Sequence, residues 1–371
     1  MAIGIIAEFN PFHNGHMYLI NEAKRMYPDD EIVVVLGGNI LQRGNLSIIE
    51  KYDKTKVALN NKVDLVVELP FSYSSEASDF FAEGSIKILN YLKVDKLIFG
   101  SEEGNLDMFY KCADVQINNK DYDHLVKTYL DEGNNYPTSM NLALKKLIGI
   151  EIDKPNDLLA LSYIKEIIKN NYNITPVTIK RTNDYHSKEL EDISSASSIR
   201  EAIKNNKDVS KFIPKEEIKY IIKDNDYFKL LKYKIISTKD LSIYASVDEG
   251  LDKRIKDAIN KSNTIEELID NIKTKRYTYN RITRMLTYIL FEYTKEDSKN
   301  KNINYIRILG FSSKGKEYIN KIKKEIEIPL ITNITKNNYE LIKEDLHKDE
   351  IYYNIINKSV NVLETKPIII K

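Results

Sequence analysis

Strand-like and helix-like patterns of apolar residues alternate through the first half of the chain. Short runs rich in β-branched residues, with little polar interruption, predict buried strands at residues 3–7, 31–36, 64–69, 96–100 and 174–180. Apolar residues at three- and four-residue spacing predict helices at residues 17–27, 48–60, 78–92 and over most of 105–170. Continuous apolar strands that alternate with helices predict an α/β fold, a doubly wound parallel sheet covered on both faces.

Helical periodicity dominates the second half. It predicts helices at residues 218–231, 250–262, 265–273 and 279–293, and the late apolar runs 305–309 and 360–370 are predicted as strands. A chain of 371 residues is long enough for two domains. We therefore expect an α/β domain over residues 1–210 and a mainly helical C-terminal domain over residues 211–371.

Composition narrows the class of protein. Hydrophobic residues make up 42% and charged residues 30%, as in a globular protein. The net charge of +1 excludes a uniformly basic nucleic-acid-binding surface, so any RNA contact needs a local basic patch. The single cysteine, Cys112, excludes an intrachain disulfide and fits a reducing compartment. No signal peptide and no apolar run of about 18 residues is present, so we expect a cytoplasmic protein without a membrane span.

The junction after the first predicted strand carries the candidate chemistry. A strand ends, a proline-containing loop turns, and a helix begins near His13-Asn14-Gly15-His16. In a doubly wound sheet ligands bind at the carboxyl ends of the strands, and a helix N-terminus there offers N–H groups and partial positive charge to a phosphate. Two imidazoles three residues apart can point at one spot. We predict His13 and His16 as catalytic donors to a phosphate that carries developing charge.

The histidine pair has two alternatives to this catalytic role. Chance placement is one. A zinc site is the other, although no cysteine or further histidine is close in the sequence. The composition therefore favours a site without a protein-bound metal.

The same residues resemble a known signature. His13-Asn14-Gly15-His16 is similar to the HxGH motif of nucleotidyltransferases, which class I aminoacyl-tRNA synthetases share. The longer string from Glu8 to His16, Glu-Phe-Asn-Pro-Phe-His-Asn-Gly-His, resembles the tRNA(Met) cytidine acetate ligase family. Weaker matches to that family occur at residues 38–44, 99–102, 155–159, 179–181, 194–200, 273–278 and 309–311, so the resemblance covers nearly the whole chain.

The resemblance implies a Rossmann-like HxGH nucleotidyltransferase fold and a ligase. Members of that family use ATP and acetate, through acetyl-adenylate, to acetylate N4 of the wobble cytidine of elongator tRNA(Met), and Mg²⁺ is expected to shield the pyrophosphate. Carried over by position, the implied ATP-binding residues are Ala7, Glu8, Phe9, Asn10, Pro11, Phe12, His13, Asn14, Gly15, His16, Ile20, Gly100, Asn156, Arg181 and Thr182. The chain departs from the family at Asn45-Leu46 and Asn183-Asp184, which affects the expected shape of those two loops.

Five further residues are candidate phosphate or loop contacts: Asn39, Arg43, Ser195, Ser198 and Arg200. Arg43 follows a strand and can face the site, or it is a solvated arginine; Asn39 binds a ligand or stabilises a turn. The serines precede a helix and fit a capping role as well as phosphate binding.

Three of the implied ATP contacts have ordinary structural alternatives. Gly100 fits a simple turn, Asn156 can cap the helix that begins near Pro155, and Arg181 can form a surface salt bridge. Their functional assignment therefore depends on whether they converge on one site.

A basic segment is the candidate RNA contact. Aromatic residues alternate with positive charges and no acid intervenes among Lys273, Lys275, Arg276, Tyr277, Arg281 and Arg284. Such a segment can follow an RNA backbone and stack on bases, or it is a solvated helix face. We expect tRNA as the macromolecular partner, and the sequence indicates no protein partner.

Two other functions remain possible from the sequence alone. One is a nucleotidyltransferase that adenylylates a small phosphorylated metabolite, which would not need the helical half. The other is a non-catalytic protein that binds ATP and tRNA, which would not need the histidine pair.

Overall fold

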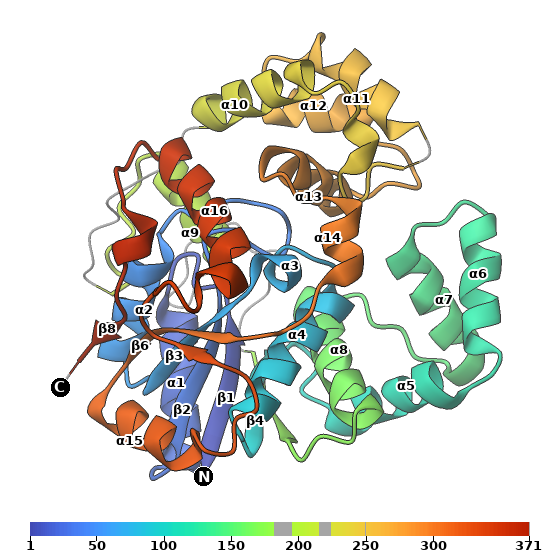
Figure 1. Cartoon of the computed structure of the whole chain (residues 1–371). Helices are drawn as coiled ribbons and strands as arrows, with labels where there is room; N and C mark the ends of the chain where they lie inside the picture. The colour runs from blue at the N-terminus through green and yellow to red at the C-terminus, as the bar shows by residue number, and fades with distance from the viewer. Residues whose placement is uncertain (182–194, 215–223, 249, 371) are drawn as a thin grey trace.

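The computed structural model describes residues 1–181, 195–214, 224–248 and 250–370. Its centre is one sheet in the order β5-β4-β1-β2-β3-β6-β7, with β8 beside β6 (Figure 1). The strands are β1 (Ala2–Ala7), β2 (Glu31–Gly37), β3 (Leu65–Leu69), β4 (Lys96–Ser101), β5 (Thr175–Lys180), β6 (Ile306–Phe311), β7 (Leu330–Ile331) and β8 (Ile368–Ile369). Strands β5 to β3 are all parallel, whereas β6 is antiparallel to β3.

Successive side chains of the central strands point to opposite faces of the sheet and so contribute to two separate apolar clusters. Val33 and Val35 of β2 belong to one apolar cluster, whereas Ile32, Val34 and Leu36 belong to the other. The central strands β1, β2 and β3 are buried on both faces, so β-branched residues fill successive positions without a polar partner face. This burial accounts for the continuous apolar runs in the sequence.

Helices cover both faces of the sheet. The face that holds Val34 is covered by α1 (Asn14–Met26) and α2 (Lys51–Asn60), and the other by α4 (Ser78–Tyr91), α8 (Pro155–Lys169) and α15 (Ser313–Ile322). Near the carboxyl ends of the strands lie α3 (Phe71–Ser74), α9 (Ala196–Lys204), α16 (Tyr339–Ile355) and the 3-10 turn η2 (Val362–Glu364).

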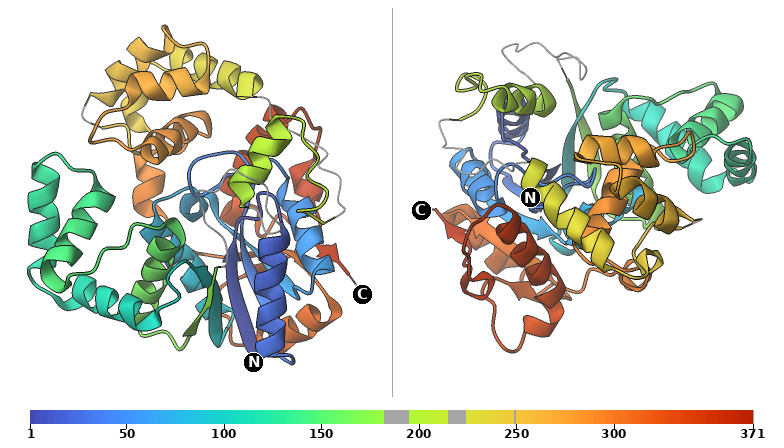
Figure 2. Two further views of the ribbon diagram at one scale, coloured as in Figure 1. Left: turned by 180° about the vertical axis from the view of Figure 1, so that it is seen from behind. Right: turned by 90° about the horizontal axis from the view of Figure 1, so that it is seen from above.

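Two groups of helices extend from this core. Helices α5 (Leu106–Asn118), α6 (Tyr122–Asp131) and α7 (Tyr136–Ile148) lie beside α8 on one side (Figure 2). The second group is α10 (Asp224–Ser237), η1 (Leu241–Ile243), α11 (Leu251–Ile259), α12 (Ile265–Ile272), α13 (Tyr279–Leu290) and α14 (Lys295–Asn300). These helices lie over the carboxyl ends of the parallel strands and share an apolar core that also contains residues of α3 and α16.

The predicted doubly wound fold is confirmed, but the C-terminal third differs from its prediction. After the helices of residues 224–300 the chain returns to the sheet as β6, and α15 and α16 pack there as well. The strand predicted over residues 360–370 is confirmed only at its end, as β8. Val362 lies in a 3-10 turn and is buried, and only Ile368–Ile369 pairs with β6.

A buried charge cluster ties α16 to the sheet. Lys51 Nζ contacts Glu68 Oε1 at 2.6 Å and also the Asp349 carboxylate, and Arg307 Nη1 donates to Asp349 Oδ2 at 3.0 Å. The side-chain amide of Asn39 donates to Asp349 Oδ1 at 2.9 Å. Because two cations face two carboxylates, the charges compensate within a low-dielectric interior.

The strand order places the ligand-binding crevice. The connection from β1 leads to β2 on one side, and after β3 the chain crosses to β4 on the other side of β1, so the carboxyl ends of β1 and β4 flank the point at which the winding reverses. Among the described residues, none of the helices has the length and apolar character needed to cross a membrane.

Candidate active site

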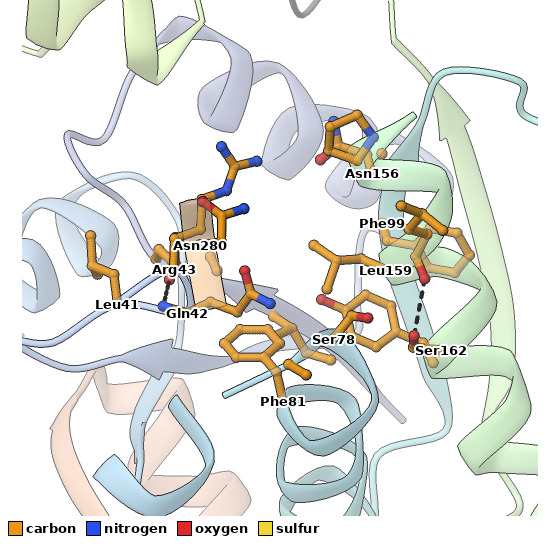
Figure 3. Close-up of a pocket in the computed structure, with 18 of the residues that line it drawn as sticks. Leu41, Gln42, Arg43, Ser78, Phe81, Phe99, Asn156, Leu159, Ser162 and Asn280 are labelled. Atoms are coloured by element: carbon orange, nitrogen blue, oxygen red, sulfur yellow. Dashed lines mark hydrogen bonds between the residues drawn. The ribbon is translucent and has the colours of Figure 1, made fainter. Parts of the chain in front are cut away.

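A cavity of about 730 Å³ opens at this crevice, between the carboxyl ends of β1 and β4 and the start of α13. The segments after β1, β2 and β4, the helices α4 and α8, and residues 276–284 contribute to its lining. Figure 3 shows Gln42, Arg43 and Asn280 on one side and Phe99, Leu159 and Ser162 on the other. Residues of both the α/β part and the helical part of the chain therefore line the cavity.

His13 and His16 line this cavity at the start of α1. His13 is the N-cap residue: its Nδ1 accepts the backbone N–H of Gly15 at 3.0 Å. His16 Nδ1 accepts the backbone N–H of His13 at 3.2 Å. The two rings lie 3.8 Å apart between centroids, so the local helix start fixes both imidazoles side by side.

This arrangement determines the protonation of the pair. Burial and the nearby charges of Arg181 and Arg200 lower the pKa of His13 to about 3. Burial, His13 and Arg181 lower the pKa of His16 well below its usual value. Both rings are neutral at pH 7, and because each Nδ1 accepts a hydrogen bond, each proton lies on Nε2. The pair thus offers two N–H donors to the cavity without charge of its own.

Aromatic packing and backbone hydrogen bonds support the loop before the histidines. Phe9 has a φ of +46°, which a bulky residue rarely adopts, and its buried ring contacts His16 at 4.9 Å between centroids. Asn10 Oδ1 accepts the backbone N–H of Ile48 at 2.8 Å. Lys54 Nζ donates to the carbonyl of Glu8 at 2.9 Å and to the carbonyls of Gly37 and Gly38. Neighbouring segments therefore hold this loop from both sides.

Cationic side chains face the histidine pair. Arg181 lines the cavity, and its Nε is buried without a hydrogen-bond partner among the described residues. A Cβ at Gly100 would lie 3.3 Å from Arg181 Cγ, so the glycine gives the arginine room to cross the end of β4. Arg200 Nη1 donates to the carbonyl of Asn10 at 2.7 Å. A buried guanidinium donor with unused hydrogen-bonding capacity, beside neutral donors, is suited to bind a phosphate.

Asn156 and Ser195 occupy the cavity wall in different roles. Asn156 lies in the first turn of α8 and is not its cap; its Nδ2 donates to Glu102 Oε1 at 2.6 Å. Glu102 Oε2 accepts the backbone N–H of Asp157, so Glu102 supports the helix start. Ser195 caps α9 by accepting the N–H of Ser198 at 3.1 Å.

The predicted site residues divide into two sets. Those that line the cavity are Ala7, Glu8, Phe9, Asn10, His13, Gly15, His16, Ile20, Arg43, Gly100, Asn156, Arg181, Ser195, Arg200, Arg276, Arg281 and Arg284. Those that the structure places elsewhere are Pro11, Phe12, Asn14, Asn39, Ser198, Lys273, Lys275 and Tyr277. Asn39 is buried, and both its amide atoms are used by Asp349 and the N–H of Lys51. Thr182 lies outside the described residues.

The basic segment is split between two environments. Arg276, Arg281 and Arg284 line the cavity, with Arg276 exposed at its edge, whereas Lys273 and Lys275 are exposed and lie outside it. Tyr277 is buried, and the Arg281 guanidinium lies 4.6 Å from its ring centroid. This tyrosine therefore packs against the protein rather than presenting a free ring to solvent.

Several lining residues are not predicted from the sequence. They are Gln42, Ser78, Phe81, Leu159, Ser162 and Asn280. Gln42 precedes Arg43 within the segment that resembles the family motif, and that position is a usable signal. Asn280 carries no such signal, because only the packing of α13 brings it to the cavity.

Comparisons with known proteins agree with this geometry. A family model described as HIGH Nucleotidyl Transferase matches residues 1–366. The tRNA(Met) cytidine acetate ligase of Mycoplasma mobile is 42% identical over 299 residues, which covers 80% of this chain and 100% of that protein. The crystal structure of Thermotoga maritima TmcAL in its apo form has a TM-score of 0.90 at 25% identity, covering 100% of this chain and 99% of that one. A second structure of TmcAL, bound with alpha-thio ATP, has a TM-score of 0.86 at 26% identity and covers 99% of this chain and 97% of that one.

The extent of these matches excludes a likeness confined to the nucleotide-binding half. The family model and the solved structures extend through the helical part and the returning strand β6. The chain belongs to the HIGH nucleotidyltransferase family and, within it, to the tRNA(Met) cytidine acetate ligase family.

Proposed function

We propose that this chain is an ATP-dependent ligase that acetylates N4 of the wobble cytidine of elongator tRNA(Met). The observation that carries the proposal is the pair of adjacent neutral imidazoles that line one cavity together with Arg181 and Arg200. The names of its relatives supply the substrate class, and TmcAL with its bound ATP analogue supports ATP as the nucleotide.

The first step forms acetyl-adenylate. An acetate oxygen attacks the α-phosphorus of ATP, the bond to the bridging oxygen breaks, and pyrophosphate leaves with that electron pair. His13 and His16 donate from Nε2 to the non-bridging oxygens, where negative charge increases in the crowded transition state. The donors are oriented before the substrate arrives, because each ring is held through its Nδ1.

Positive charge comes from arginines rather than from the histidines. Arg181, whose buried Nε has no partner within the described ranges, is placed to bind a phosphate, and Gly100 keeps the path of its side chain open. Ser195 caps the start of α9, where outer phosphates would meet a helix N-terminus, and Arg200 lines the cavity from the second turn of that helix. Asn156 lines the cavity, and the hydrogen bond from its Nδ2 to Glu102 holds the side chain in place, so its Oδ1 is the atom offered to the nucleoside.

Mg²⁺ fits this site as a companion of the nucleotide. In the described ranges of the chain, no group of three or more His, Cys, Asp or Glu side chains is arranged to hold a metal ion. Mg²⁺ usually keeps several waters and binds substrate phosphates with few carboxylates. When bound it would neutralise charge on the leaving pyrophosphate, with the triphosphate as its main ligand.

The second step transfers the acetyl group to tRNA. The cytosine N4 amine attacks the carbonyl carbon of acetyl-adenylate, the bond to the phosphate oxygen breaks, AMP leaves, and the amine loses one proton. No covalent enzyme intermediate is required. Arg276, Arg281 and Arg284 lie where the backbone of the entering RNA would pass, and the exposed Lys273 and Lys275 extend that positive surface.

The direct test combines product analysis with substrate choice. The purified chain is incubated with ATP, acetate and unmodified tRNA(Met), and the tRNA is digested and analysed by mass spectrometry. We expect one acetyl group on one anticodon cytidine, with AMP and pyrophosphate released in equal amounts. Pyrophosphate release with phosphopantetheine or nicotinamide mononucleotide, but not with acetate, would instead support an adenylyltransferase of small metabolites.

A further inference from the structure

The cavity continues past the histidine pair into a compartment with two unlike walls. Leu159 of α8 provides apolar surface on one side, Gln42 and Asn280 project from the other, and Phe81 of α4 lies below Gln42 (Figure 3). Gln42 follows β2, and Asn280 lies in the first turn of α13. The compartment therefore combines parts of the chain that are distant in sequence.

The strand order places this compartment on a different side of β1 from the residues expected to bind the nucleotide. β1 leads into the loop and helix start that hold the histidine pair. Its neighbour in the sheet is β4 on one side and β2 on the other. Gly100 and Arg181 belong to the β4 side, whereas Gln42 belongs to the β2 side. A nucleotide that reaches from Asn156 to the histidines thus leaves the β2 side open for the second substrate.

The wall that carries the two amides is held as one unit. Gly44 has a φ of +80°, and a Cβ there would lie 2.5 Å from the backbone nitrogen of Arg284. The hydroxyl of Thr287 donates to the carbonyl of Gly44. The loop after β2 therefore packs directly on α13, which fixes Gln42 and Asn280 on the same side of the cavity.

Both amides are half-buried, and within the described part of the chain neither side chain makes a hydrogen bond. A side-chain amide offers two donors and an acceptor with two lone pairs, and leaving these unmet at a partly buried site is unfavourable. The pair is therefore suited to a ligand edge that itself carries donors and acceptors.

We propose that Gln42 and Asn280 bind the Watson–Crick edge of the acceptor cytosine, with its ring against Phe81 and Leu159. This inference rests on the proposed function and deepens it. Cytosine presents an N4 amine as donor and N3 and O2 as acceptors, which side-chain amides complement. An amide oxygen that accepts one N4 hydrogen orients the amine toward the acyl carbon. Arg276, Arg281 and Arg284, on the same side of the cavity, meet the flanking phosphates.

The experiment measures the two half-reactions separately. Gln42→Met removes the amide at similar length, and Asn280→Asp keeps the shape but removes the donors. Acetate-dependent exchange of pyrophosphate into ATP reports acetyl-adenylate formation. Single-turnover transfer from preformed enzyme-bound acetyl-adenylate to a tRNA(Met) anticodon stem-loop reports the second step.

Two controls match the variants in residue type. Gln116 also lines the cavity, but its Nε2 donates to the Tyr122 hydroxyl at 3.1 Å, and only its Oε1 has no partner among the described residues, so Gln116→Met changes an amide that is already held by one hydrogen bond. Asn260 lies at the end of α11, outside the cavity, and Asn260→Asp is its counterpart. Thermal unfolding of all four variants checks that they fold.

We expect transfer to fall on the order of 10-fold in each cavity variant, while exchange stays within about threefold of wild type. Equal transfer rates in wild type and both variants would overturn the inference. So would a higher KM for ATP with a matching loss of exchange, because the amides would then belong to the nucleotide. If wild-type exchange does not depend on acetate, the proposed function itself fails.

Discussion

His13 and His16 fix one another through the backbone: each Nδ1 accepts an N–H of the same helix start, and the ring centroids lie 3.8 Å apart. The histidines therefore serve at once as helix cap and as donors to substrate. Substitutions that keep one role and remove the other can separate the two.

His13→Asn keeps a capping acceptor but removes the Nε2 donor, whereas His13→Ala removes both. Loss of a donor to the developing charge costs on the order of 100- to 1,000-fold in rate. Loss of the cap costs about 1 kcal/mol of stability. We expect both variants to lose acetyl-adenylate formation by this factor, and only His13→Ala to be destabilised by about 1 kcal/mol in urea unfolding. Exchange at the wild-type rate in His13→Asn would contradict the role of the donor.

His16→Ala should likewise nearly abolish activity while the protein stays folded. The ring makes the hydrogen bond from the His13 backbone and packs on Phe9, so a loss of the same size is expected in pyrophosphate exchange. Circular dichroism of the variant checks the fold. Unchanged exchange would remove His16 from the catalytic assignment.

Acid should destabilise the protein through the same pair. The pKa of His13 is about 3 in the folded state and near 6.5 in the unfolded chain. Between these values the unfolded chain binds a proton that the folded chain excludes, so the free energy of unfolding falls as pH drops below about 6.5, by about 1.4 kcal/mol per pH unit. At pH 7 this contribution is fully present. Urea unfolding of wild type and His13→Asn at pH 7 and pH 5 should show the smaller loss in the variant, and equal losses would contradict the burial of a neutral ring.

Gly44→Ala should separate the loop after β2 from α13. A methyl group there would meet the Arg284 backbone at 2.5 Å, and the φ of +80° is unfavourable for alanine. We expect a loss of about 1–3 kcal/mol in stability and a fall in acetyl transfer. Gly133→Ala is the matched control, since its φ is +89° but no atom of the described residues lies within 4 Å of the added carbon. Similar losses in both variants would show that conformation alone, and not the contact with α13, sets the cost.

Asp349→Ala should destabilise the fold strongly without touching the cavity. It leaves Lys51 and Arg307 buried with one carboxylate, Glu68, and breaking such a group costs about 3–5 kcal/mol. Lys343→Ala, on the same helix α16, removes an exposed pair with Glu340 and should leave the unfolding midpoint unchanged. A small effect of Asp349→Ala would mean that the cluster relaxes or hydrates.

The sequence predicted the central sheet because its strands are buried on both faces and read as continuous apolar runs. It did not predict α16, because that helix buries Lys348 and Asp349 together with tyrosines, which blurs its apolar stripe. Apolar residues near the end of the chain suggested a strand, yet Val362 fills the core from a 3-10 turn. Local periodicity cannot distinguish these outcomes, since tertiary packing decides them.

The site followed the same division. The histidine loop could be predicted because its chemistry lies within four residues and one helix start. The basic segment could not be assigned from spacing, because the orientation of α13 turns Arg281 and Arg284 to the cavity, whereas Arg276 lies at its edge before the helix and Lys273 lies outside. The sequence also left open whether Asn39 binds a ligand or stabilises a turn. Its side chain is buried against Asp349 of α16, a contact with a helix far along the chain that local sequence does not reveal.

The return of β6 to the edge of β3 makes the helices of residues 224–300 an insertion with an anchor at each end. A module tethered twice can rock against the sheet, but it cannot swing free as a terminal appendage would. Shortening the chain from its C-terminus would strip an edge strand before it reached those helices. A nucleotide-binding fragment without them would have to be made by excision and rejoining of the two flanking segments.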